Sequence, residues 1–452
     1  MNRRTFLKAS GASIAASSFL KLSDAIANTS VASNEDYKAL VCVFLYGGMD
    51  NHDTVIPFDD KSYEQWARIR SSMLAGYSNK RTRNNLIALN TPARFGFRKF
   101  ALPPELTNTA RLYQQGKLAI VGNVGPLIEP TSALAIEAET AKLPKRLFSH
   151  NDQQSTWGSG KVEGAQLGWA GRLNDALIAQ GVKVPSTFSA ITTTGSELML
   201  TGNETTPFHV SDGQGAKIDI YDDLDQPDLL KQHFSALGHK SDNLLSQDIA
   251  KSMSNSFNAN QKYSDAIENG SWNFAPFPAS GIAQQLQTIS KSIAVRSQLG
   301  EKRQVFMVAL GGFDTHSAQA KLLPKLQSSL DEALGHFDSA MQSLGLSNNV
   351  TLFTASDFGR TLTVNGDGTD HGWGSHHFVM GGAVNGGTIF GDLPEPTFGH
   401  RLDAGQGRLI PTLSVDQYAA ALGAWLGVEQ SALNTIFPNL ANFSAMPKLF
   451  KS

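Results

Sequence analysis

The sequence contains little cysteine, little charge and, after its first 27 residues, no long apolar run. Its 452 residues include one cysteine, Cys42, which excludes an internal disulfide and lies in an apolar run where a small buried side chain is expected. Charged residues make up 17% of the chain without Lys/Arg clusters, which argues against a nucleic acid partner. A membrane span needs about 20 consecutive apolar residues, and no such run follows residue 27.

A dinucleotide-binding fingerprint is also missing. Glycine pairs occur at 47–48 and 311–312, but neither continues as Gly-x-Gly-x-x-Gly into a helix. We interpret them as tight turns that let the backbone approach a crevice. The 41% of hydrophobic residues is ample for a large buried core, so the chain is expected to be globular.

The first 27 residues have the pattern of a twin-arginine export signal. Arg3 and Arg4 precede Phe-Leu-Lys and a weakly apolar stretch, and Ala-Ile-Ala at 25–27 is typical of a cleavage site. The alternative, a short amphipathic helix, does not explain the paired arginines. Cleavage would remove four of the 38 basic and one of the 40 acidic residues, which leaves a net charge of −5. We expect the twin-arginine export machinery to carry the protein to the periplasm or beyond, with no stable membrane span.

Three strand-like apolar runs each lead to an aspartate. Runs 39–45, 305–310 and 350–355 precede Asp50, Asp314 and Asp357, respectively. In an open α/β sheet the ligand crevice lies outside the carboxyl ends of the strands, so these acids can converge on one site. His316 and His371 follow the second and third runs, and carboxylates with imidazoles are typical metal ligands.

Helix-like segments alternate with these runs. The spacing of apolar residues predicts helices at 61–74, 106–115, 281–299 and 318–344, and a further buried strand at 118–121. The last helix joins two of the aspartate strands, as in a parallel strand-helix-strand unit. Residues from about 172 to 281 are less regular, apart from a plausible strand at 186–193, and we interpret them as an inserted cover region. The pattern predicts an α/β fold.

A loop at 146–154 carries a second group of polar residues. Ser149, with Asp152 three residues later, resembles a helix N-cap with an acidic third position, so we expect a helix to begin here. A hydroxyl at a helix N-terminus faces the positive end of the helix dipole, which favours bound anions. Ser149 is therefore an ordinary N-cap or a nucleophile, with Ser155 as an alternative nucleophile. His150 and Asp152 could be metal ligands or could orient them.

Five motifs in order make the chain similar to an exported family, domain of unknown function 1501. They are Gly47-Gly48-Met49-Asp50, Phe148 to Gln154, Gly311 to His316, Ser356 to Thr361 with Gly368 to Gly372, and Gly407 to Pro411 with Asp416-Gln417-Tyr418. This family is placed in the alkaline phosphatase-like clan, with sulfatases and cofactor-independent phosphoglycerate mutases. The resemblance implies a three-layer α/β/α sandwich with a mostly parallel central sheet. It also implies a single domain at 28–452, with 172–281 as its inserted or irregular cover.

The clan resemblance implies a crevice in which two metal ions clamp a phosphoryl or sulfuryl group. The residues that match the clan's ligands are Asp50, Asp314, His316, Asp357 and His371. One departure is Phe358, which stands where a ligand histidine usually follows the acid; another is the short spacing from Asp314 to His316. His376 or His377 could supply the missing ligand, or a single metal could bind. Oxygen and nitrogen ligands suit zinc, manganese, magnesium, calcium or iron.

Two further residues complete the candidate site. Arg360 could contact an anionic substrate with two hydrogen bonds, or it could brace Asp357. Asp370 fits a turn residue or a partner that orients a histidine better than it fits a ligand.

The sequence therefore predicts a metal-dependent hydrolase of phosphate or sulfate esters, with a small anionic substrate. The chain lacks the Cys/Ser-x-Pro-Ser/Thr-Arg motif that sulfatases of the clan mature, which argues against an ordinary sulfatase. The competing hypothesis is a non-catalytic exported protein that keeps the clan fold and one structural metal, and that serves in binding or envelope assembly.

Overall fold

A central sheet of mostly parallel strands organises the fold, and β1 (Lys38–Leu45) lies in its middle. β1 pairs in parallel with β9 (Arg303–Leu310) on one side and with β10 (Val350–Ser356) on the other. These are the three strands that the apolar runs predict. Their side chains, Cys42 included, are almost all buried, as expected for parallel strands that helices cover on both faces.

The strand order of the sheet is β14-β5-β13-β10-β1-β9-β6-β7-β8, with β15 also paired to β5. The remaining strands are β5 (Leu118–Gly125), β6 (Ala190–Thr192), β7 (Phe208–Ser211), β8 (Gln214–Gly215), β13 (Ser375–Met380), β14 (Ile389–Gly391) and β15 (Leu413–Ser414). β13 is antiparallel to both of its neighbours and β8 is antiparallel to β7, whereas the other pairs are parallel. The predicted α/β fold with a mostly parallel sheet is confirmed.

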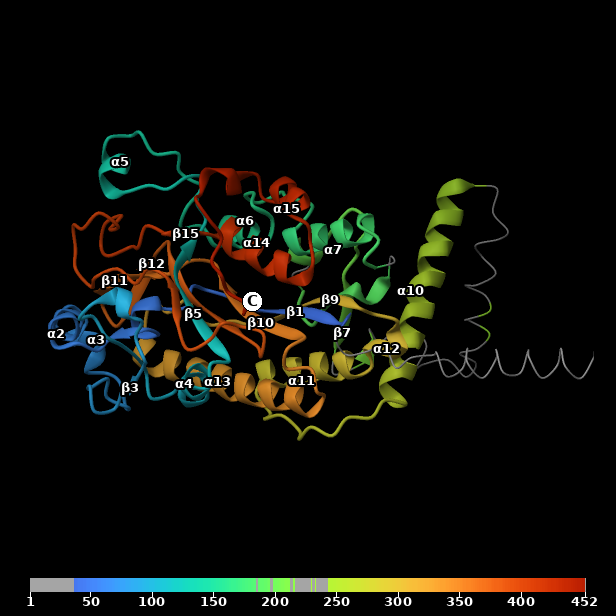
Figure 1. The fold of residues 1–452 in the computed structure, drawn as a ribbon, viewed down its shortest axis with the longest axis horizontal. Coiled ribbons are helices and arrows are strands. Elements are labelled where there is room, and N and C mark those ends of the chain that lie inside the picture. Colours follow the sequence, from blue (N-terminus) through green and yellow to red (C-terminus); the bar gives the residue numbers. More distant parts are fainter. Residues whose placement is uncertain are drawn as a thin grey trace, which may run out of the picture. The chain divides into compact units, whose positions relative to one another are not determined.

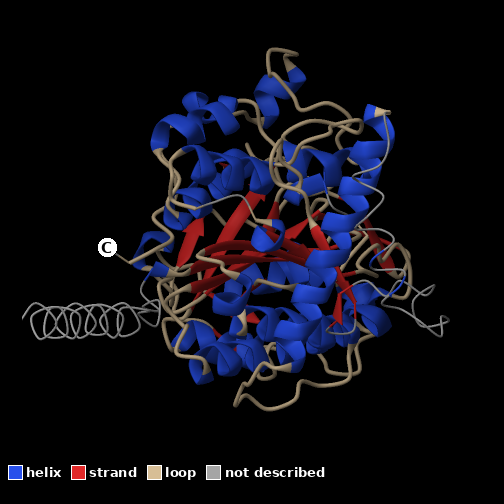
Figure 2. Ribbon diagram, turned by 90° about the vertical axis from the view of Figure 1, so that its right-hand side faces the viewer, coloured by secondary structure: helices blue, strands red, loops and turns tan. Residues whose placement is uncertain are grey.

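Helices cover both faces of the sheet and give a three-layer α/β/α sandwich (Figures 1 and 2). One layer contains α4 (Thr107–Gln114), α11 (Gly281–Ala294) and α13 (Gln319–Ser343). The other contains α6 (His150–Ser159), α7 (Trp169–Ala179), α14 (Val415–Leu426) and α15 (Gln430–Ile436). The remaining helices are α2 (Asp60–Ile69), α3 (Ser71–Leu74), α5 (Ala133–Glu137), α12 (Arg296–Leu299) and the long α10 (Leu244–Glu268).

Two small sheets lie outside the central one. The hairpin of β11 (Arg360–Asn365) and β12 (Gly368–His371) follows β10 directly, so it is anchored where that strand ends. The other small sheet contains β2 (Ile56–Pro57), β4 (Phe100–Leu102) and β3 (Ile87–Ala88). The hairpin matters for the site because it begins and ends with two of the predicted site residues.

The structure, a computed structural model, describes residues 36–183, 186–195, 198–211, 214–215, 229, 232 and 243–451. Arg3, Arg4 and the predicted cleavage site lie outside these residues. Lys38–Ser452 form one compact unit. No helix in the described part of the chain is long and apolar enough to cross a membrane.

The predicted helices occur with two interruptions. The segment 61–74 is divided into α2 and α3 at Arg70, and the segment 281–299 into α11 and α12 at Val295. The break at Arg70 has a visible partner, because its guanidinium donates a hydrogen bond to Asp50 at 2.7 Å. Periodicity could not detect this break, since it depends on a residue 20 positions away.

The segment 172–281 is partly core. Within the predicted strand 186–193, β6 joins the central sheet in parallel beside β9, and β7 continues the sheet beyond it. The strands are short, which explains why the surrounding polar residues dominate the sequence pattern. The described part of this segment therefore extends the sheet, in addition to contributing α10.

His376 and His377 lie in the core on β13. The main-chain N–H of Asn123 donates to His376 Nδ1 at 3.0 Å, while the His377 ring lies 4.9 Å from the Trp157 ring and 6.1 Å from the Tyr418 ring. Burial lowers the pKa of each histidine to about 3. The structure therefore does not bring either histidine to the carboxylates as a replacement ligand.

The buried neutral histidines predict sensitivity to acid. Because the pKa of His377 falls from 6.5 to about 3 on burial, its contribution to stability is complete above pH 6.5 and is lost as the pH falls toward about 3. His377→Phe should therefore flatten the acid side of the stability curve by up to about 1.4 kcal/mol per pH unit. Urea unfolding at pH 4 to 7 measures this slope. His336→Phe, at a half-buried position on α13, is the control. If both variants flatten the pH dependence of stability equally, the acid sensitivity does not come from His377.

Candidate functional site

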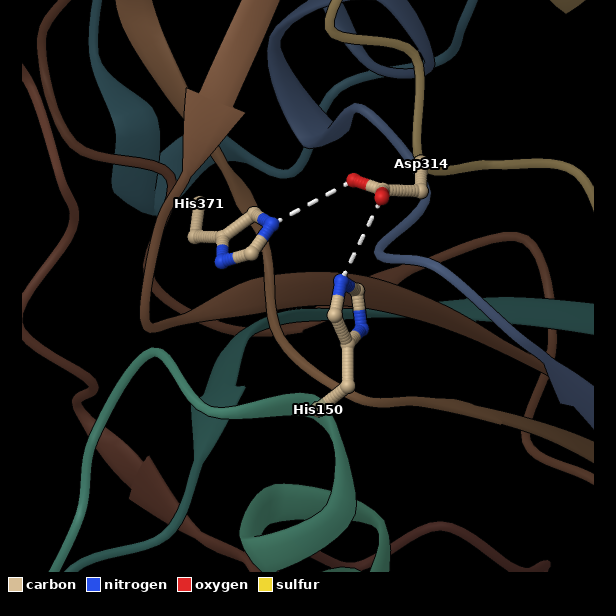
Figure 3. Close-up of side chains that lie close together, drawn as sticks. All are labelled: His150, Asp314 and His371. Carbon is tan, nitrogen blue, oxygen red and sulfur yellow. Dashed lines mark hydrogen bonds and ion pairs between the residues drawn. The ribbon is translucent and has the colours of Figure 1, made fainter.

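Three histidines surround Asp314 at the carboxyl end of the sheet. Asp314 and His316 follow β9, His150 begins α6, and His371 ends β12. We call these four residues the Asp314 cluster. Figure 3 shows His150 and His371 pointing at the two oxygens of the carboxylate from different elements.

The nitrogens that face Asp314 are all Nε2 atoms. Asp314 Oδ1 lies 3.0 Å from His316 Nε2 and 3.3 Å from His371 Nε2, and Oδ2 lies 3.5 Å from His150 Nε2. The Nε2 atoms of His316 and His371 are 2.9 Å apart. Imidazole and carboxylate ligand atoms thus converge, as the sequence predicts for two of the three histidines.

The opposite nitrogen of each ring is held by an oxygen. His150 Nδ1 lies 2.5 Å from Asp357 Oδ2, His371 Nδ1 lies 2.8 Å from the carbonyl oxygen of Phe148, and His316 Nδ1 lies 3.3 Å from Asp370 Oδ1. An oxygen acceptor at Nδ1 favours the tautomer with its proton there, which leaves the Nε2 lone pair available. All three rings therefore present Nε2 toward Asp314, and Asp370 contacts His316 from the opposite side of its ring.

Neighbouring charges and burial shift the pKa values of the cluster. The hydrogen bond to Asp357 raises the pKa of His150, although burial opposes this. Burial lowers the pKa of His371. Burial by itself would raise the pKa of Asp314, but the hydrogen bond and charge of Arg360 lower it overall. The carboxylate is therefore ionised and available at neutral pH.

Arg360 braces Asp314 rather than Asp357. Its side chain is fully buried, and Nη1 donates to Asp314 Oδ1 at 2.9 Å and to the carbonyl oxygen of Gly47 at 3.2 Å. Nε donates to Thr369 Oγ1 at 3.2 Å, and Nη2 donates to the Thr369 carbonyl. Because these contacts use most of its donors inside the protein, Arg360 positions the carboxylate and is not free for bidentate contact with a substrate.

Phe358 forms an apolar wall at the place where the clan has a ligand histidine. Its ring centre lies 4.8 Å from that of His150 and 4.4 Å from that of His371. The ring restricts both imidazoles and reduces the water around them. Phe358 therefore packs against two histidines of the Asp314 cluster and offers no ligand atom of its own.

The loop before α6 is strained where it holds His371. Phe148 has φ of 72°, which is rare for a residue with a side chain and costs about 1–3 kcal/mol. Arg408 offsets this cost, because its guanidinium lies 5.4 Å from the Phe148 ring and its Nε donates to the His371 carbonyl at 2.8 Å. The strained conformation directs the Phe148 carbonyl to His371 Nδ1.

Asp50 is not brought to the cluster. Its carboxylate is buried and accepts hydrogen bonds from Arg70 at 2.7 Å and from Gln319 at 2.5 Å. Burial would raise its pKa, but the Arg70 guanidinium holds it below the ordinary value. Gln319 also accepts from Thr369, the residue that holds Arg360, so Asp50 is connected to the cluster through a hydrogen-bond chain.

Ser149 is the N-cap of α6, as predicted, but its hydroxyl does not cap the helix. Ser149 Oγ donates to Asp152 Oδ2 at 2.8 Å. Asp152 also accepts from Arg146 and from the main-chain N–H of Glu163. The structure thus engages Ser149 and Asp152 with each other and with the surrounding loop, and brings neither one to the Asp314 cluster.

The donor set fits one divalent metal ion. Ligand atoms about 2.0–2.1 Å from a tetrahedral ion are about 3.3 Å apart, close to the 2.9–3.3 Å among Asp314 Oδ1, His316 Nε2 and His371 Nε2. Ligand atoms of His150, Asp314 and His371 also lie within 4.8 Å of one another, and His150 Nε2 is buried without a hydrogen-bond partner. A second ion would need Asp50 and a histidine at position 358, which this arrangement does not provide.

A family model described as "Protein of unknown function (DUF1501)" matches residues 37–406, which is most of the sequence. The chain belongs to the DUF1501 family. A search of the curated proteins finds no match. The family assignment confirms the resemblance drawn from the five motifs. Four of these motifs lie within the matched residues, and the last begins just after them, at Gly407.

Several solved structures are similar to this DUF1501 chain, and one of them is described as a protein in the alkaline phosphatase superfamily. This protein, from Vibrio parahaemolyticus, is 10% identical in sequence, and the match covers 90% of this chain and 71% of the Vibrio chain, with a TM-score of 0.37. The lipoteichoic acid synthase LtaP from Listeria monocytogenes is 9% identical, and the match covers 91% of this chain and 79% of LtaP, with a TM-score of 0.35. The sulfatase PsFucS1 from Pseudoalteromonas sp. is 9% identical, and the match covers 93% of this chain and 75% of PsFucS1, with a TM-score of 0.33. At these TM-scores the similarities are distant and identify no activity.

Two glutamines of the DUF1501 chain contribute contacts that sequence reasoning missed. Gln154 Nε2 donates to Asp357 Oδ2 at 3.0 Å, and Gln319 connects Asp50 with Thr369. Gln154 could have been found, because it lies four residues after His150 and so on the same face of α6. Gln319 could not, since Asp50 and Thr369 come from two distant segments.

The two roles considered for Asp50 give different outcomes on substitution. If Asp50 serves as half of a buried ion pair, Asp50→Asn should lower the free energy of unfolding by about 3–5 kcal/mol, because the Arg70 charge remains buried without compensation. The exposed pair of Asp60 and Arg83 provides the control, and Asp60→Asn should cost about 1 kcal/mol or less. Chemical denaturation measures both costs. Unchanged stability together with loss of bound metal would instead make Asp50 a ligand.

Proposed function

We propose that this DUF1501 protein is an exported hydrolase of phosphate or sulfate esters that works with one divalent metal ion. The observation that carries the proposal is the orientation of three imidazoles, each held at Nδ1 by an oxygen and each presenting Nε2 toward Asp314. An arrangement that only stabilised the fold would not require three lone pairs to converge.

Each residue of the cluster has a distinct task in this proposal. His150, Asp314 and His371 would hold the ion, and His316 Nε2 lies beside them, 3.0 Å from Asp314 Oδ1. Asp357 orients His150, while the Phe148 carbonyl orients His371. Arg360 fixes the Asp314 carboxylate from the buried side. When bound, a divalent ion supplies Lewis-acid polarisation of an ester oxygen and lowers the pKa of a coordinated water.

The charges around the cluster suit a divalent ion. Arg360 offsets the charge of Asp314, while Asp357 at the back of His150 and Asp370 beside His316 add two negative charges. A divalent ion would neutralise these two charges, and as a Lewis acid it would supply the attraction for an oxygen of a phosphate or sulfate ester.

Water is the nucleophile in this proposal. Ser149, the first candidate, donates its hydroxyl to Asp152. The side chains of Asp314 and His316 are each 44% exposed, so water reaches the ligand atoms from the solvent side. The Ser149 hydroxyl is then expected to matter for the loop and not for the chemical step.

Metal quantification on the purified protein tests the centre. Wild type should bind one equivalent of metal, and Asp357→Asn should weaken the affinity about 10–100-fold, because it removes the charge that orients His150. Titration with zinc or manganese by calorimetry measures the affinity. Asp367→Asn, at an exposed position in the β11–β12 turn, is the matched control and should bind like wild type. Wild type without stoichiometric metal would overturn the proposal.

A non-catalytic metal-binding protein is the second candidate function. Two observations favour it. Phe358 stands where the clan resemblance predicts a ligand histidine, and Asp50 is engaged in an ion pair, so two ligands expected for a second metal ion are missing. One equivalent of metal without hydrolysis of phenyl phosphate or phenyl sulfate would identify this second function.

Export by the twin-arginine route is proposed from Arg3 and Arg4. Replacing both by lysine should keep the charge but remove the paired guanidinium groups, and the protein should then accumulate in the cytoplasm. Cell fractionation measures the distribution, and Lys8→Arg is the control with unaltered paired arginines. Normal export of the double variant would exclude the twin-arginine route.

A further inference from the structure

A small cavity lies beside α6. It has a volume of about 200 Å³. Half of its lining residues are apolar or aromatic, and they come from the end of β1 and the residue after it, from β9 and from the 3₁₀ helix Leu198–Leu200: Phe44, Tyr46, Leu198, Met199 and Met307. α6 contributes Asn151, Gln154, Ser155 and Gly158, and Glu163 completes the lining.

The cavity is connected to the Asp314 cluster through one side chain. Gln154 lines the cavity, and its Nε2 donates to Asp357 Oδ2 at 3.0 Å. Asp357 in turn holds His150, so two successive contacts join the cavity to the proposed metal ligand. A molecule bound beside Gln154 would therefore lie next to the proposed catalytic centre.

The size and chemistry of the lining select a neutral ring. A dry cavity of about 150 Å³ is known to bind benzene, so about 200 Å³ accommodates one ring with a substituent. Two methionines and two aromatic residues suit a flat apolar group, because methionine adapts its shape and its sulfur makes favourable contacts with rings. The amides of Asn151 and Gln154 can hydrogen-bond to a ring substituent.

The charge of the cavity assigns the orientation of a substrate. Of the residues that line it, Glu163 is the single charged one, and its negative charge disfavours an anionic group there. The proposed metal centre favours the anionic group. We propose that this cavity is the subsite for the alcohol part of the substrate, and that the substrates are phosphate or sulfate esters of a neutral, largely apolar ring such as a phenol.

This inference rests on the proposed hydrolase function, but the cavity can be tested without activity. Phenol is the probe, and ¹³C-methyl methionine NMR of the full-length mature protein is the readout. Signals of Met199 and Met307, identified with Met→Leu variants, should shift with phenol and not with inorganic phosphate. Glycerol, which has no ring, should leave both signals in place. If phenol shifts neither signal, the cavity is not a ring-binding site.

Gly158 offers a substitution that fills the cavity. It lies within α6, and a Cβ added there would be 3.5 Å from the Met199 backbone, an ordinary contact. Gly158→Leu should abolish the phenol-induced shifts, whereas Gly158→Ala adds one methyl group and should retain most of them. Leu198→Trp, at a half-buried position, fills the cavity from the other side if Gly158→Leu does not fold.

Kinetics of the metal-loaded protein complete the test. Loss of ring burial should lower the ratio of kcat/KM for phenyl phosphate over methyl phosphate by about tenfold or more in Gly158→Leu. An unchanged ratio in the folded variant would overturn the subsite. Phenol binding without hydrolysis of any ester would instead overturn the proposed function, and with it the assignment of the cavity to a substrate, while the ring-binding cavity itself would remain.

Discussion

The hydrogen bond between His150 and Asp357 connects helix α6 to the central sheet and determines the geometry of the site. Asp357 is buried at the end of β10, and His150 is the first residue of α6. A buried carboxylate is unfavourable unless it is paired, so the histidine is held firmly in place. Its other nitrogen is thereby directed toward Asp314. Gln154, one helical turn later, donates to the same carboxylate and also lines the neighbouring cavity.

Buried ionic groups behind the cluster position it without taking part in it. Asp50 pairs with Arg70, and the hydrogen-bond chain through Gln319 and Thr369 ends at Arg360. Such pairs are costly to assemble because both charges lose water, and breaking one leaves an uncompensated charge. The strand-end acid of β1 is therefore used for structure, whereas the acid after β9 remains accessible for ligation.

The site also explains how a phenylalanine can stand where the clan has a ligand histidine. Phe358 packs on two imidazoles that are already oriented by other groups, and so it contributes shape to the proposed metal centre. Asp50 is held in its ion pair with Arg70. Both features fit the proposal of a single ion, and the adjoining cavity is the proposed subsite for the organic part of the substrate.

The sequence by itself determined the elements and the fold class. Continuous apolar runs predicted β1, β9 and β10, apolar periodicity predicted α4 and α13, and five local motifs predicted the family. It also placed Asp314, His316 and His371 near one another, because the ends of neighbouring parallel strands meet at one edge.

Only the tertiary structure decided which polar residues belong together. Sequence order does not show that Asp50 meets Arg70, that His150 meets Asp357 or that Ser149 meets Asp152. Nor does it show that His376 and His377 point into the core or that β6 joins the sheet. The physical reason is that the role of a charged or polar side chain is determined by its partner and its burial. Both are properties of residues far apart in the chain, whereas apolar periodicity is a local property that the sequence displays directly.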